Sequence, residues 1–265
     1  MTISFVGGGV MAEALVKGVI TAGIDKPGEI IVSEPISARR AYLESEDGIK
    51  TVEMNVSLAE SDGLLVLAVK PQTLPYVFSD LKGAIGEQRS VVSIVAGARI
   101  ETIRKGLSHE PLIRVMPNTP AQIGMGMSVW TASNEVSDSD RSTISQILKT
   151  LGEEYYVEDE GYIDMATGLS ASGPAYVFLF IESLIDAGVY LGMPRDMARK
   201  LSLQTILGST ELVKQTGDHP AVLKDMVTSP GGTTIEGLTL MENAGFRSAV
   251  TGGVRAAFNR SKELG

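Results

Sequence analysis

The sequence contains no cysteine, which excludes disulfides, zinc–thiolate sites, iron–sulfur clusters and a cysteine nucleophile. A chain without disulfides suits a reducing compartment. Histidine is also scarce: the two histidines, His109 and His219, lie in no recognisable motif, and we expect both at the surface. The motifs of a Walker phosphate loop, a serine-hydrolase elbow and a helical zinc protease are absent as well. Thiol, hydrolytic and metal-protease chemistry are therefore poor hypotheses.

The chain also lacks a basic run and a long apolar run. Its net charge is −9, from 23 basic and 32 acidic residues, so we expect no nucleic-acid partner. The longest purely apolar stretch near the middle, Ala175–Ile181, is too short to span a bilayer, and the chain begins almost directly with a strand. We therefore expect a cytoplasmic protein with no membrane partner. Hydrophobic residues at 43% and charged residues at 21% predict an ordinary packed core.

What the sequence does have is a regular alternation of strands and helices. Short apolar runs predict strands at 2–6, 29–33, 64–69, 90–95 and 112–116. Helical patterns lie between most of them; the first of these helices ends at Gly23. Strands that alternate with helices are typical of an α/β fold with a parallel sheet. The N-terminal part is therefore predicted to be a Rossmann-type α/β domain with a mostly parallel sheet.

The pattern changes after Ser137. Asp138 is expected to cap a helix that runs to about residue 151, and a short strand at 155–157 to close the sheet. No convincing strand follows residue 163, and helices are predicted at 172–192, 194–215 and 246–264. We therefore predict a dinucleotide-binding domain over 1–160 and an all-α domain over 161–265.

The stretch Ala175–Ile181 is apolar on every side of its predicted helix. A helix that is hydrophobic all round must be buried. In a domain of about 100 residues, a partner subunit is one way to bury it, and the core of a monomeric bundle is the other. We expect the shared interface, and so an all-α dimerisation domain.

A glycine-rich motif follows the first predicted strand. Gly7, Gly9 and Ala12 fit the pattern G-x-G-x-x-A and open a helix. The first glycine allows a tight turn, the second lets the backbone approach a pyrophosphate, and the alanine permits close packing of helix on strand. The pyrophosphate would lie at the helix N-terminus. A glycine turn without a ligand is the alternative, which the strand–turn–helix context disfavours.

Glu34 stands at the end of the second predicted strand, 25 positions after Gly9. An acidic residue there accepts hydrogen bonds from the ribose hydroxyls of a dinucleotide and repels a 2′-phosphate. Arg39 and Arg40 follow closely, either to offset that repulsion or as surface residues of a helix. A loop carboxylate that faces solvent is the alternative for Glu34.

Two further strand ends carry polar residues. Lys70 and Pro71 end the strand at 64–69, and Asn118 lies in the rigid turn after the strand at 112–116. Ligands of open α/β sheets bind beyond the carboxyl ends of the strands. Lys70 is thus placed to reach a cofactor, and Asn118 to contact nicotinamide or ribose; a lysine that simply faces water is the alternative.

A second glycine turn lies in the helical part, at Ser229–Thr234. The backbone N–H groups of such a turn form a cradle for an anion, and a substrate carboxylate would suit it. Thr234 adds a hydroxyl that donates and accepts, although threonine also serves as a plain helix cap. Oxidation of a hydroxy acid usually needs a base, and none is evident here. A protonated imine, in contrast, already carries the charge that accepts hydride.

Taken together, these segments resemble pyrroline-5-carboxylate reductase over nearly the whole chain. The resemblance rests on five segments: GGGVMAEAL, AVKP, MPNTP, GLSASGPAY and LKDMVTSPGGTTIEGL. It implies an NAD(P)H-binding domain followed by a helical domain that interleaves with that of a second subunit. It also implies a homodimer, which some members assemble into a decamer.

The resemblance and the motifs described above together give the candidate site residues. By position, the resemblance itself implies Gly8, Val10, Met11, Asn55, Ala68, Val69, Lys70, Ala96, Asn118, Glu160, Thr233 and Thr234, and the motifs add the others. Those on the pyrophosphate and adenosine side are Gly7, Gly8, Gly9, Val10, Met11, Glu34 and Asn55. Those on the nicotinamide side are Ala68, Val69, Lys70, Pro71, Ala96 and Asn118. Those that hold the substrate are Glu160, Ser229, Gly231, Gly232, Thr233 and Thr234, of which Thr234 is the catalytic candidate.

The implied reaction is the reduction of L-1-pyrroline-5-carboxylate to L-proline by NADPH or NADH. The family often has asparagine at the position of Val10 and a small polar residue at that of Glu34. The carboxylate of Glu34 therefore suggests a preference for NADH. The alternatives are a reductase of a related cyclic imine and a dinucleotide-binding regulator that has lost turnover.

Overall fold

The computed structural model describes residues 3–59 and 61–264, and within these residues eight strands form one sheet. Its order is β3-β2-β1-β4-β5-β6-β7-β8. Neighbouring strands are parallel except for the antiparallel pair β6–β7, which confirms the predicted mostly parallel sheet. The strands are β1 (Ser4–Val6), β2 (Ile31–Ser33), β3 (Lys50–Val52), β4 (Leu65–Leu67), β5 (Val91–Ser93), β6 (Leu112–Met116), β7 (Gly126–Ala132) and β8 (Gly152–Tyr156).

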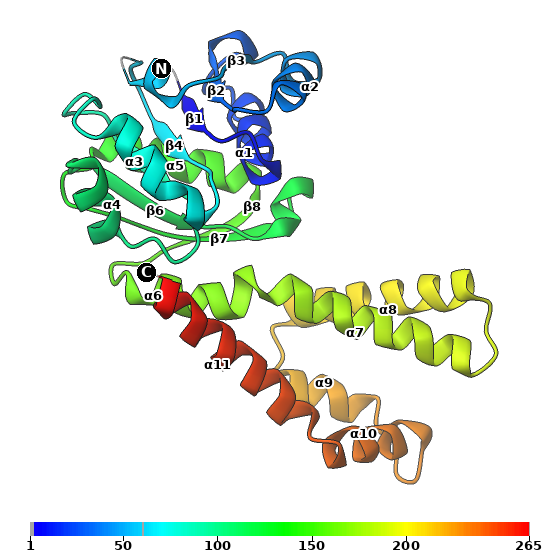
Figure 1. Ribbon diagram of the computed structural model, residues 1–265. Coiled ribbons are helices and arrows are strands. Elements are labelled where there is room, and N and C mark those ends of the chain that lie inside the picture. The colour runs from blue at the N-terminus through cyan, green and yellow to red at the C-terminus, as the bar shows by residue number, and fades with distance from the viewer. Residues whose placement is uncertain (1–2, 60, 265) are drawn as a thin grey trace. The chain divides into compact units, whose positions relative to one another are not determined.

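Helices connect the strands and make up the C-terminal part (Figure 1). They are α1 (Val10–Thr21), α2 (Ser37–Asp47), α3 (Leu74–Leu81), α4 (Ile100–Leu107), α5 (Asp138–Thr150), α6 (Gly161–Ala166), α7 (Gly173–Tyr190), α8 (Arg195–Thr216), α9 (Pro220–Met226), α10 (Thr233–Asn243) and α11 (Phe246–Leu264). A π-helical turn, Thr167–Ala171, joins α6 to α7.

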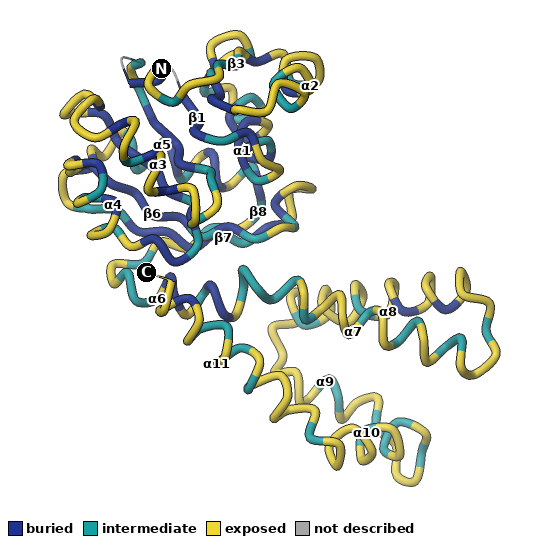
Figure 2. The backbone as a smooth tube through the Cα atoms, in the orientation of Figure 1, coloured by how far each residue is buried: buried dark blue, intermediate teal, exposed yellow. Residues whose placement is uncertain are grey.

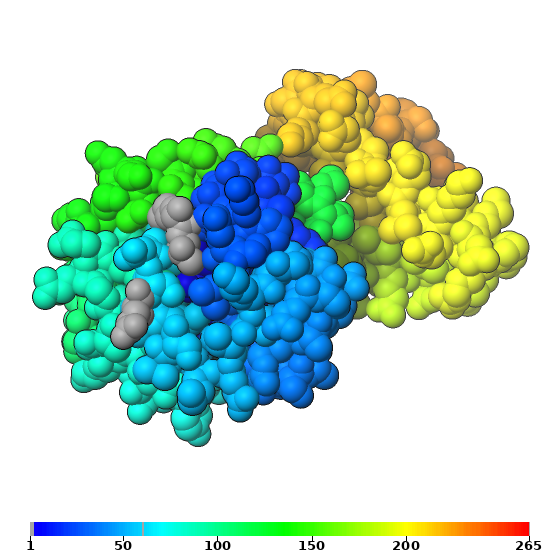
Figure 3. Space-filling model, turned by 90° about the horizontal axis from the view of Figure 1, so that it is seen from above, coloured from blue at the N-terminus to red at the C-terminus, as the bar shows by residue number. Residues whose placement is uncertain are grey.

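Alternate residues of the central strands β2, β1, β4, β5 and β6 supply two separate cores on the two faces of the sheet. Phe5 of β1 joins the core beneath α1 and α5, whereas its neighbour Val6 joins the core beneath α3 and α4. The same alternation holds in β4, where Val66 faces the first core and Leu67 the second. The buried residues in Figure 2 gather in these strands, and Figure 3 shows the outer surface of the same part of the chain, coloured from blue to green. A sheet covered on both faces explains the continuous apolar runs.

The chain divides into two compact units, 1–172 with 256–265, and 173–255. The first unit extends beyond the predicted boundary at 160/161, because α6 contacts β6 and β7 and the last turns of α11 return to the sheet unit. In the second unit, α7 and α8 lie side by side, with Gly188 close to Ala198. A methyl group on Gly188 would come within 2.7 Å of the Ala198 side chain, so glycine permits this approach.

The second unit exposes most of its large apolar side chains in the single chain. Phe178, Leu179, Leu207 and Leu240 are all more than half exposed. One stretch of the described residues, Gly161–Tyr190, is long and apolar enough to cross a membrane by length and composition alone, which by itself is weak evidence of a span. An apolar surface of this extent is typical of a protein–protein interface.

The structure corrects several sequence expectations. Strands β3 and β7 were not predicted; β7 pairs antiparallel with β6 and so breaks the βα alternation on which the prediction relied. Ser137, rather than Asp138, caps α5, because its hydroxyl accepts the N–H of Asp140. His109 is buried, and its Nε2 lies 2.6 Å from the carbonyl oxygen of Arg89, whereas His219 is exposed as expected.

Candidate cofactor and substrate sites

The glycine loop lies at the point where the strand order of the sheet reverses. Strand β1 sits between β2 and β4, so the chain leaves β1 to one side and later returns to the other. This is where open α/β sheets bind ligands. Two cavities flank the loop, one of about 340 Å³ that includes Gly9 and one of about 420 Å³ that includes Gly7. A larger hollow of about 710 Å³ lies beyond the amino ends of β4 and β5, away from the loop.

Two glycines of the loop are required for different reasons. Gly7 has φ +94°, and a Cβ there would come within 2.8 Å of the Ala68 carbonyl oxygen, so the fold itself requires glycine. Gly9 has an ordinary φ of −68°, and a Cβ there would meet nothing within 4 Å. Neither the backbone nor a protein neighbour explains Gly9. Close approach of a ligand does explain it, so the loop fits a dinucleotide pyrophosphate.

Helix α1 begins beside this open space. Gly9 is its N-cap and supplies no side-chain cap, so the first N–H groups of the helix, beginning with that of Val10, lack an intrahelical partner. Val10 and Met11 line the adjoining cavity. Unpaired N–H groups and the positive end of the helix dipole together form an anion site.

Several of the residues predicted for the nicotinamide side line the cavity that includes Gly9. It is lined by Gly9, Val10, Met11, Ala68, Val69, Lys70, Ile94, Met116, Pro117, Asn118, Thr119 and Ala171. Lys70 is exposed there and places a positive charge beside the loop. Pro71 and Ala96 are not among the lining residues of either cavity.

Asn118 has a role that the sequence did not indicate. Its Nδ2 lies 3.3 Å from both the carbonyl and the hydroxyl oxygen of Ser170, and its Oδ1 accepts the N–H of Met127 at 2.8 Å. The amide therefore links the turn after β6 to the π-helical turn and to β7. Single π-turns are frequent at functional sites, and here Ala171 of that turn forms part of the cavity wall.

The second cavity corresponds to the predicted adenosine side. It is lined by Gly7, Ser33, Pro35, Glu53, Met54, Asn55, Val56, Val69, Thr73, Tyr76, Val77 and Asp80. Asn55 is fixed in orientation, because its Oδ1 accepts from the Ser33 hydroxyl at 2.6 Å and its Nδ2 donates to Asp80 at 2.8 Å. Ser33, Tyr76 and Asp80 were missed from the sequence. The strand-end rule applied to β2 indicates Ser33, and no local signal indicates the two residues of α3.

Glu34 is buried at 8% exposure and points back to the glycine loop rather than to solvent. Its Oε2 accepts the N–H of Gly8, and its Oε1 accepts the N–H of Ile36, both at 3.0 Å. Arg39 contacts the same loop from α2, with its Nε 2.6 Å from the Gly8 carbonyl oxygen and its Nη2 2.6 Å from Glu13. Burial raises the pKa of Glu13, but hydrogen bonds from Lys17 and Arg39 outweigh it and lower that pKa overall. Both Glu34 and Arg39 thus stabilise the loop.

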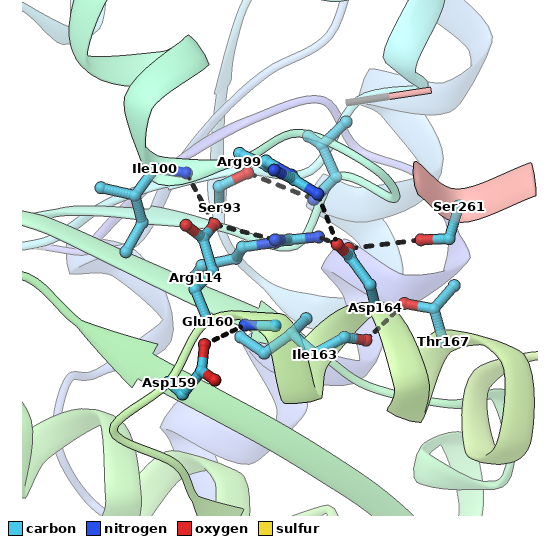
Figure 4. Close-up of polar contacts among 12 residues, drawn as sticks. Ser93, Arg99, Ile100, Arg114, Asp159, Glu160, Ile163, Asp164, Thr167 and Ser261 are labelled. Atoms are coloured by element: carbon cyan, nitrogen blue, oxygen red, sulfur yellow. Dashed lines mark hydrogen bonds and ion pairs between the residues drawn. The ribbon is translucent and has the colours of Figure 1, made fainter. Parts of the chain in front are cut away.

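Glu160, predicted to hold substrate, belongs to a buried network of charges (Figure 4). Its Oε1 accepts from Nη1 of Arg114 and from the N–H of Ile100, each at 2.8 Å. The other guanidinium nitrogen of Arg114 donates to Asp164 at 2.8 Å, and Arg99 and Ser261 also contact Asp164. Among the described residues, Oε2 of Glu160 has no protein partner. The network therefore fixes Glu160 and leaves one of its carboxylate oxygens available.

The predicted substrate turn, Ser229–Thr234, lies in the second unit. Gly231 has φ +65°, so the turn requires glycine there, whereas a Cβ on Gly232 would meet mainly the Ser229 hydroxyl, which can rotate away. The N-cap of α10 is Gly232, and no side chain caps this helix. Thr234 is the second residue of α10, so it is not the cap, and its hydroxyl has no partner among the described residues. The turn presents free N–H groups and a free hydroxyl.

Comparison with known proteins shows to which family the chain belongs. Residues 160–264 match the family model described as pyrroline-5-carboxylate reductase dimerisation, and residues 2–97 match that described as NADP oxidoreductase, coenzyme F420-dependent. The pyrroline-5-carboxylate reductase of Synechocystis is 46% identical over 99% of this chain and 98% of its own length. The chain belongs to the pyrroline-5-carboxylate reductase family.

Other members of the family agree over the same length. The pyrroline-5-carboxylate reductase of Escherichia coli is 38% identical over 99% of this chain and 97% of its own. A crystal structure of the Plasmodium falciparum pyrroline carboxylate reductase with NADP bound is 34% identical, covers 100% of this chain and 98% of its own, and has a TM-score of 0.91. This reductase fold therefore holds over the full chain, and the predicted Rossmann-type and helical dimerisation parts are confirmed.

The open space around Gly9 makes Gly9→Ala a test of whether a ligand requires glycine at this position. The variant should keep the wild-type melting temperature, because its Cβ meets no protein atom. Affinity for NADH and NADPH should fall, since a methyl group forced against a ligand costs about 1–3 kcal/mol. Fluorescence titration of the reduced nucleotides measures the affinity, and Gly7→Ala, which should instead destabilise the fold, is the matched control. Unchanged nucleotide affinity in Gly9→Ala would contradict a pyrophosphate at this loop.

The buried network predicts that Arg114→Met destabilises the protein by about 3–5 kcal/mol, because it leaves two carboxylates without their buried partner. Urea unfolding at fixed protein concentration measures this loss. Arg104→Met is the control, because Arg104 forms only partly exposed pairs with Glu101 and Glu110 and should cost less than about 1 kcal/mol. Equal losses in the two variants would show that the network contributes nothing special to stability.

Proposed function

We propose that this protein reduces L-1-pyrroline-5-carboxylate to L-proline with a reduced nicotinamide dinucleotide. The observation that carries the proposal is the identity of 36–46% with pyrroline-5-carboxylate reductases of a cyanobacterium, plants and Escherichia coli over nearly the full chain. The glycine loop and the Ser229–Thr234 turn support it, because each offers unpaired N–H groups to an anion.

The reduced nicotinamide supplies the hydride when it is bound. Protein residues then have three tasks: to bind the dinucleotide, to orient the imine and to exclude water. The N-terminus of α1 and Lys70 hold the dinucleotide phosphates and the nicotinamide side. The Ser229–Thr234 turn receives the carboxylate of the substrate. Bringing two bound partners together accounts for most of the rate enhancement, since correct positioning alone contributes several kcal/mol to lowering the barrier.

Thr234 orients the imine in this proposal. Its hydroxyl has no partner among the described residues, so it is free to hydrogen-bond the ring nitrogen. A hydroxyl both donates and accepts, so it can serve the imine, the iminium and the amine product alike. Hydride transfer to the imine carbon then needs no separate protein acid, because the nitrogen is already protonated and makes the carbon electrophilic. Glu160 provides a carboxylate oxygen that can meet the positive charge of the ring nitrogen.

For the cofactor, we propose that NADH is favoured and that NADPH is also accepted. Two carboxylates, Glu53 and Asp80, line the adenosine cavity, and the described lining residues include no lysine or arginine. Ribose hydroxyls donate readily to carboxylates, whereas a 2′-phosphate faces like charge. The buried carboxylate of Glu34 lies directly behind the loop and adds to that negative charge.

For assembly, we propose a homodimer with interleaved helical units, in the cytoplasm. The matched dimerisation model spans 160–264, and the exposed apolar side chains of α7 and α8 need a partner to cover them. A second copy of the same chain covers them symmetrically. In such a dimer the glycine loop of one chain faces the Ser229–Thr234 turn of the other. The resemblance also implies that such dimers associate into a decamer.

The proposed reaction predicts that purified protein oxidises NADH or NADPH only when pyrroline-5-carboxylate is present, and that proline accumulates in equal amount. Absorbance of the reduced nucleotide and amino-acid analysis of the product measure the two. A six-membered cyclic imine carboxylate is the matched substrate control, and faster reduction of that ring would favour the related-imine alternative. Folded protein that binds nucleotide but forms no proline would instead indicate the non-catalytic regulator.

Thr234→Ala should lower kcat/KM by about tenfold to a few hundredfold, because a hydrogen bond to a charged group is worth roughly 1.5–3 kcal/mol. Nucleotide affinity should stay at the wild-type value. Thr239→Ala is the control, since Thr239 lies on the same helix and its hydroxyl donates only to the Ile235 carbonyl oxygen. Wild-type efficiency in Thr234→Ala would remove Thr234 from the mechanism.

The proposed dimer predicts that no active monomer exists at micromolar concentration. Light scattering coupled to gel filtration should give at least twice the chain mass of 28.1 kDa. Replacing two exposed apolar residues of α7 with charge, as in Phe178→Glu/Leu179→Glu, should dissociate the assembly and abolish activity together. An active species with the mass of one chain would refute the shared interface.

A further inference from the structure

The described residues that line the adenosine cavity include no cation that could bind the 2′-phosphate of NADPH. Glu53 and Asp80 make the cavity acidic, and a 2′-phosphate needs a cation. The two arginines of α2 are the candidates, and they differ in what they contact. Arg39 is bound to the Gly8 carbonyl oxygen and to Glu13, on the loop side. Its guanidinium is committed to holding the loop.

Arg40 instead lies at the rim of the adenosine cavity. Its Nη1 donates to the carbonyl oxygens of Glu34 and Pro35 at 2.8 and 2.9 Å, and its Nη2 lies 3.3 Å from Oε2 of Glu53. Pro35 and Glu53 both line the cavity. The guanidinium therefore sits where a ribose substituent would be recognised, and a carboxylate of the same rim neutralises it.

Glu34 is poorly suited to discriminate between NADH and NADPH on its own. Both of its carboxylate oxygens accept backbone N–H groups, and it is buried at 8% exposure. The side chain of Glu53, in contrast, is 70% exposed and has Arg40 as its ion-pair partner among the described residues. A change in Glu53 alters the charge at the rim without disturbing the glycine loop.

We propose that the Glu53–Arg40 ion pair sets the choice between NADH and NADPH. Glu53 holds the guanidinium that would otherwise bind the 2′-phosphate of NADPH, and its own charge opposes that phosphate. Glu53 is thus a specificity-determining residue that the glycine motif and Glu34 do not reveal. The proposal rests on the proposed use of a nicotinamide dinucleotide, and it concerns the adenosine end alone.

The strength of the pair explains why discrimination is partial. An exposed ion pair is worth little, because water and salt screen it. A phosphate with nearly two negative charges competes for Arg40 better than a single carboxylate does. NADPH can therefore displace Glu53 from Arg40, at a cost in affinity that NADH does not meet.

The test compares ligands that differ only in the 2′-phosphate. Calorimetry gives the affinities of adenosine 2′,5′-bisphosphate and adenosine 5′-monophosphate, and fluorescence gives those of NADPH and NADH. Glu53→Gln should shift the ratio of affinities toward the phosphorylated ligand by about five- to tenfold, through loss of one like charge and release of Arg40. Asp80→Asn is the matched control: it removes one negative charge from the same cavity without touching Arg40, and should shift the ratio less than about threefold.

The double variant Arg40→Met/Glu53→Gln separates release of the arginine from simple loss of charge. Its ratio should fall back to that of Asp80→Asn, because no guanidinium remains to bind the phosphate. An equal shift in Glu53→Gln and Asp80→Asn, or a shift that survives loss of Arg40, would overturn the proposal. These binding measurements do not depend on turnover, so a protein that forms no proline would refute the proposed reaction while leaving this inference to be decided by the ligands.

Discussion

The packing of the first unit depends on one buried cation, Arg114, which must pair with carboxylates. Arg114 is 1% exposed and stands on β6 in the interior of the sheet, where an unpaired guanidinium would be prohibitively unstable. Its two carboxylate partners, Glu160 and Asp164, are four residues apart and therefore lie on one face of the helical turn that begins α6. Pairing with Arg114 fixes that turn against the sheet, and with it the point at which the chain leaves for the helical unit.

The same network also contacts the C-terminal end of the chain, in the last turns of α11. Ser261, in the last turns of α11, contacts Asp164, and Leu264 packs so closely on Gly97 that a Cβ there would come within 2.6 Å of it. Gly97 belongs to the segment between β5 and α4, whose first N–H, that of Ile100, is bound by Glu160. One cluster of charges thus joins β6, α4, α6 and α11. A similar logic holds at the glycine loop, where the buried Glu34 accepts the Gly8 N–H and fixes the loop before any ligand arrives.

The sequence was most informative where structure is local. Apolar runs and glycines predicted β1, β2, β4, β5 and β6, the loop at Gly7–Gly9 and the turn at Ser229–Thr234, because period and turn chemistry are properties of neighbouring residues. What could not be predicted was the pairing of residues far apart in the chain. Arg114 interrupts an otherwise apolar strand, which indicates a buried charge. Nothing near it in the sequence indicates that its partners lie 46 and 50 positions later.

The two halves of the proposed site are supported by different parts of the fold. The dinucleotide half is complete within one unit, where strand ends, a helix N-terminus and a buried carboxylate are held by a rigid sheet. The substrate half is a turn on helices whose large apolar side chains are left exposed in a single chain. A hydride acceptor that is already cationic needs no strong acid or base, so the protein can rely on placement. In the proposed dimer a second copy covers the apolar faces of these helices, so we infer that the assembly which buries them is a condition of catalysis rather than an addition to it.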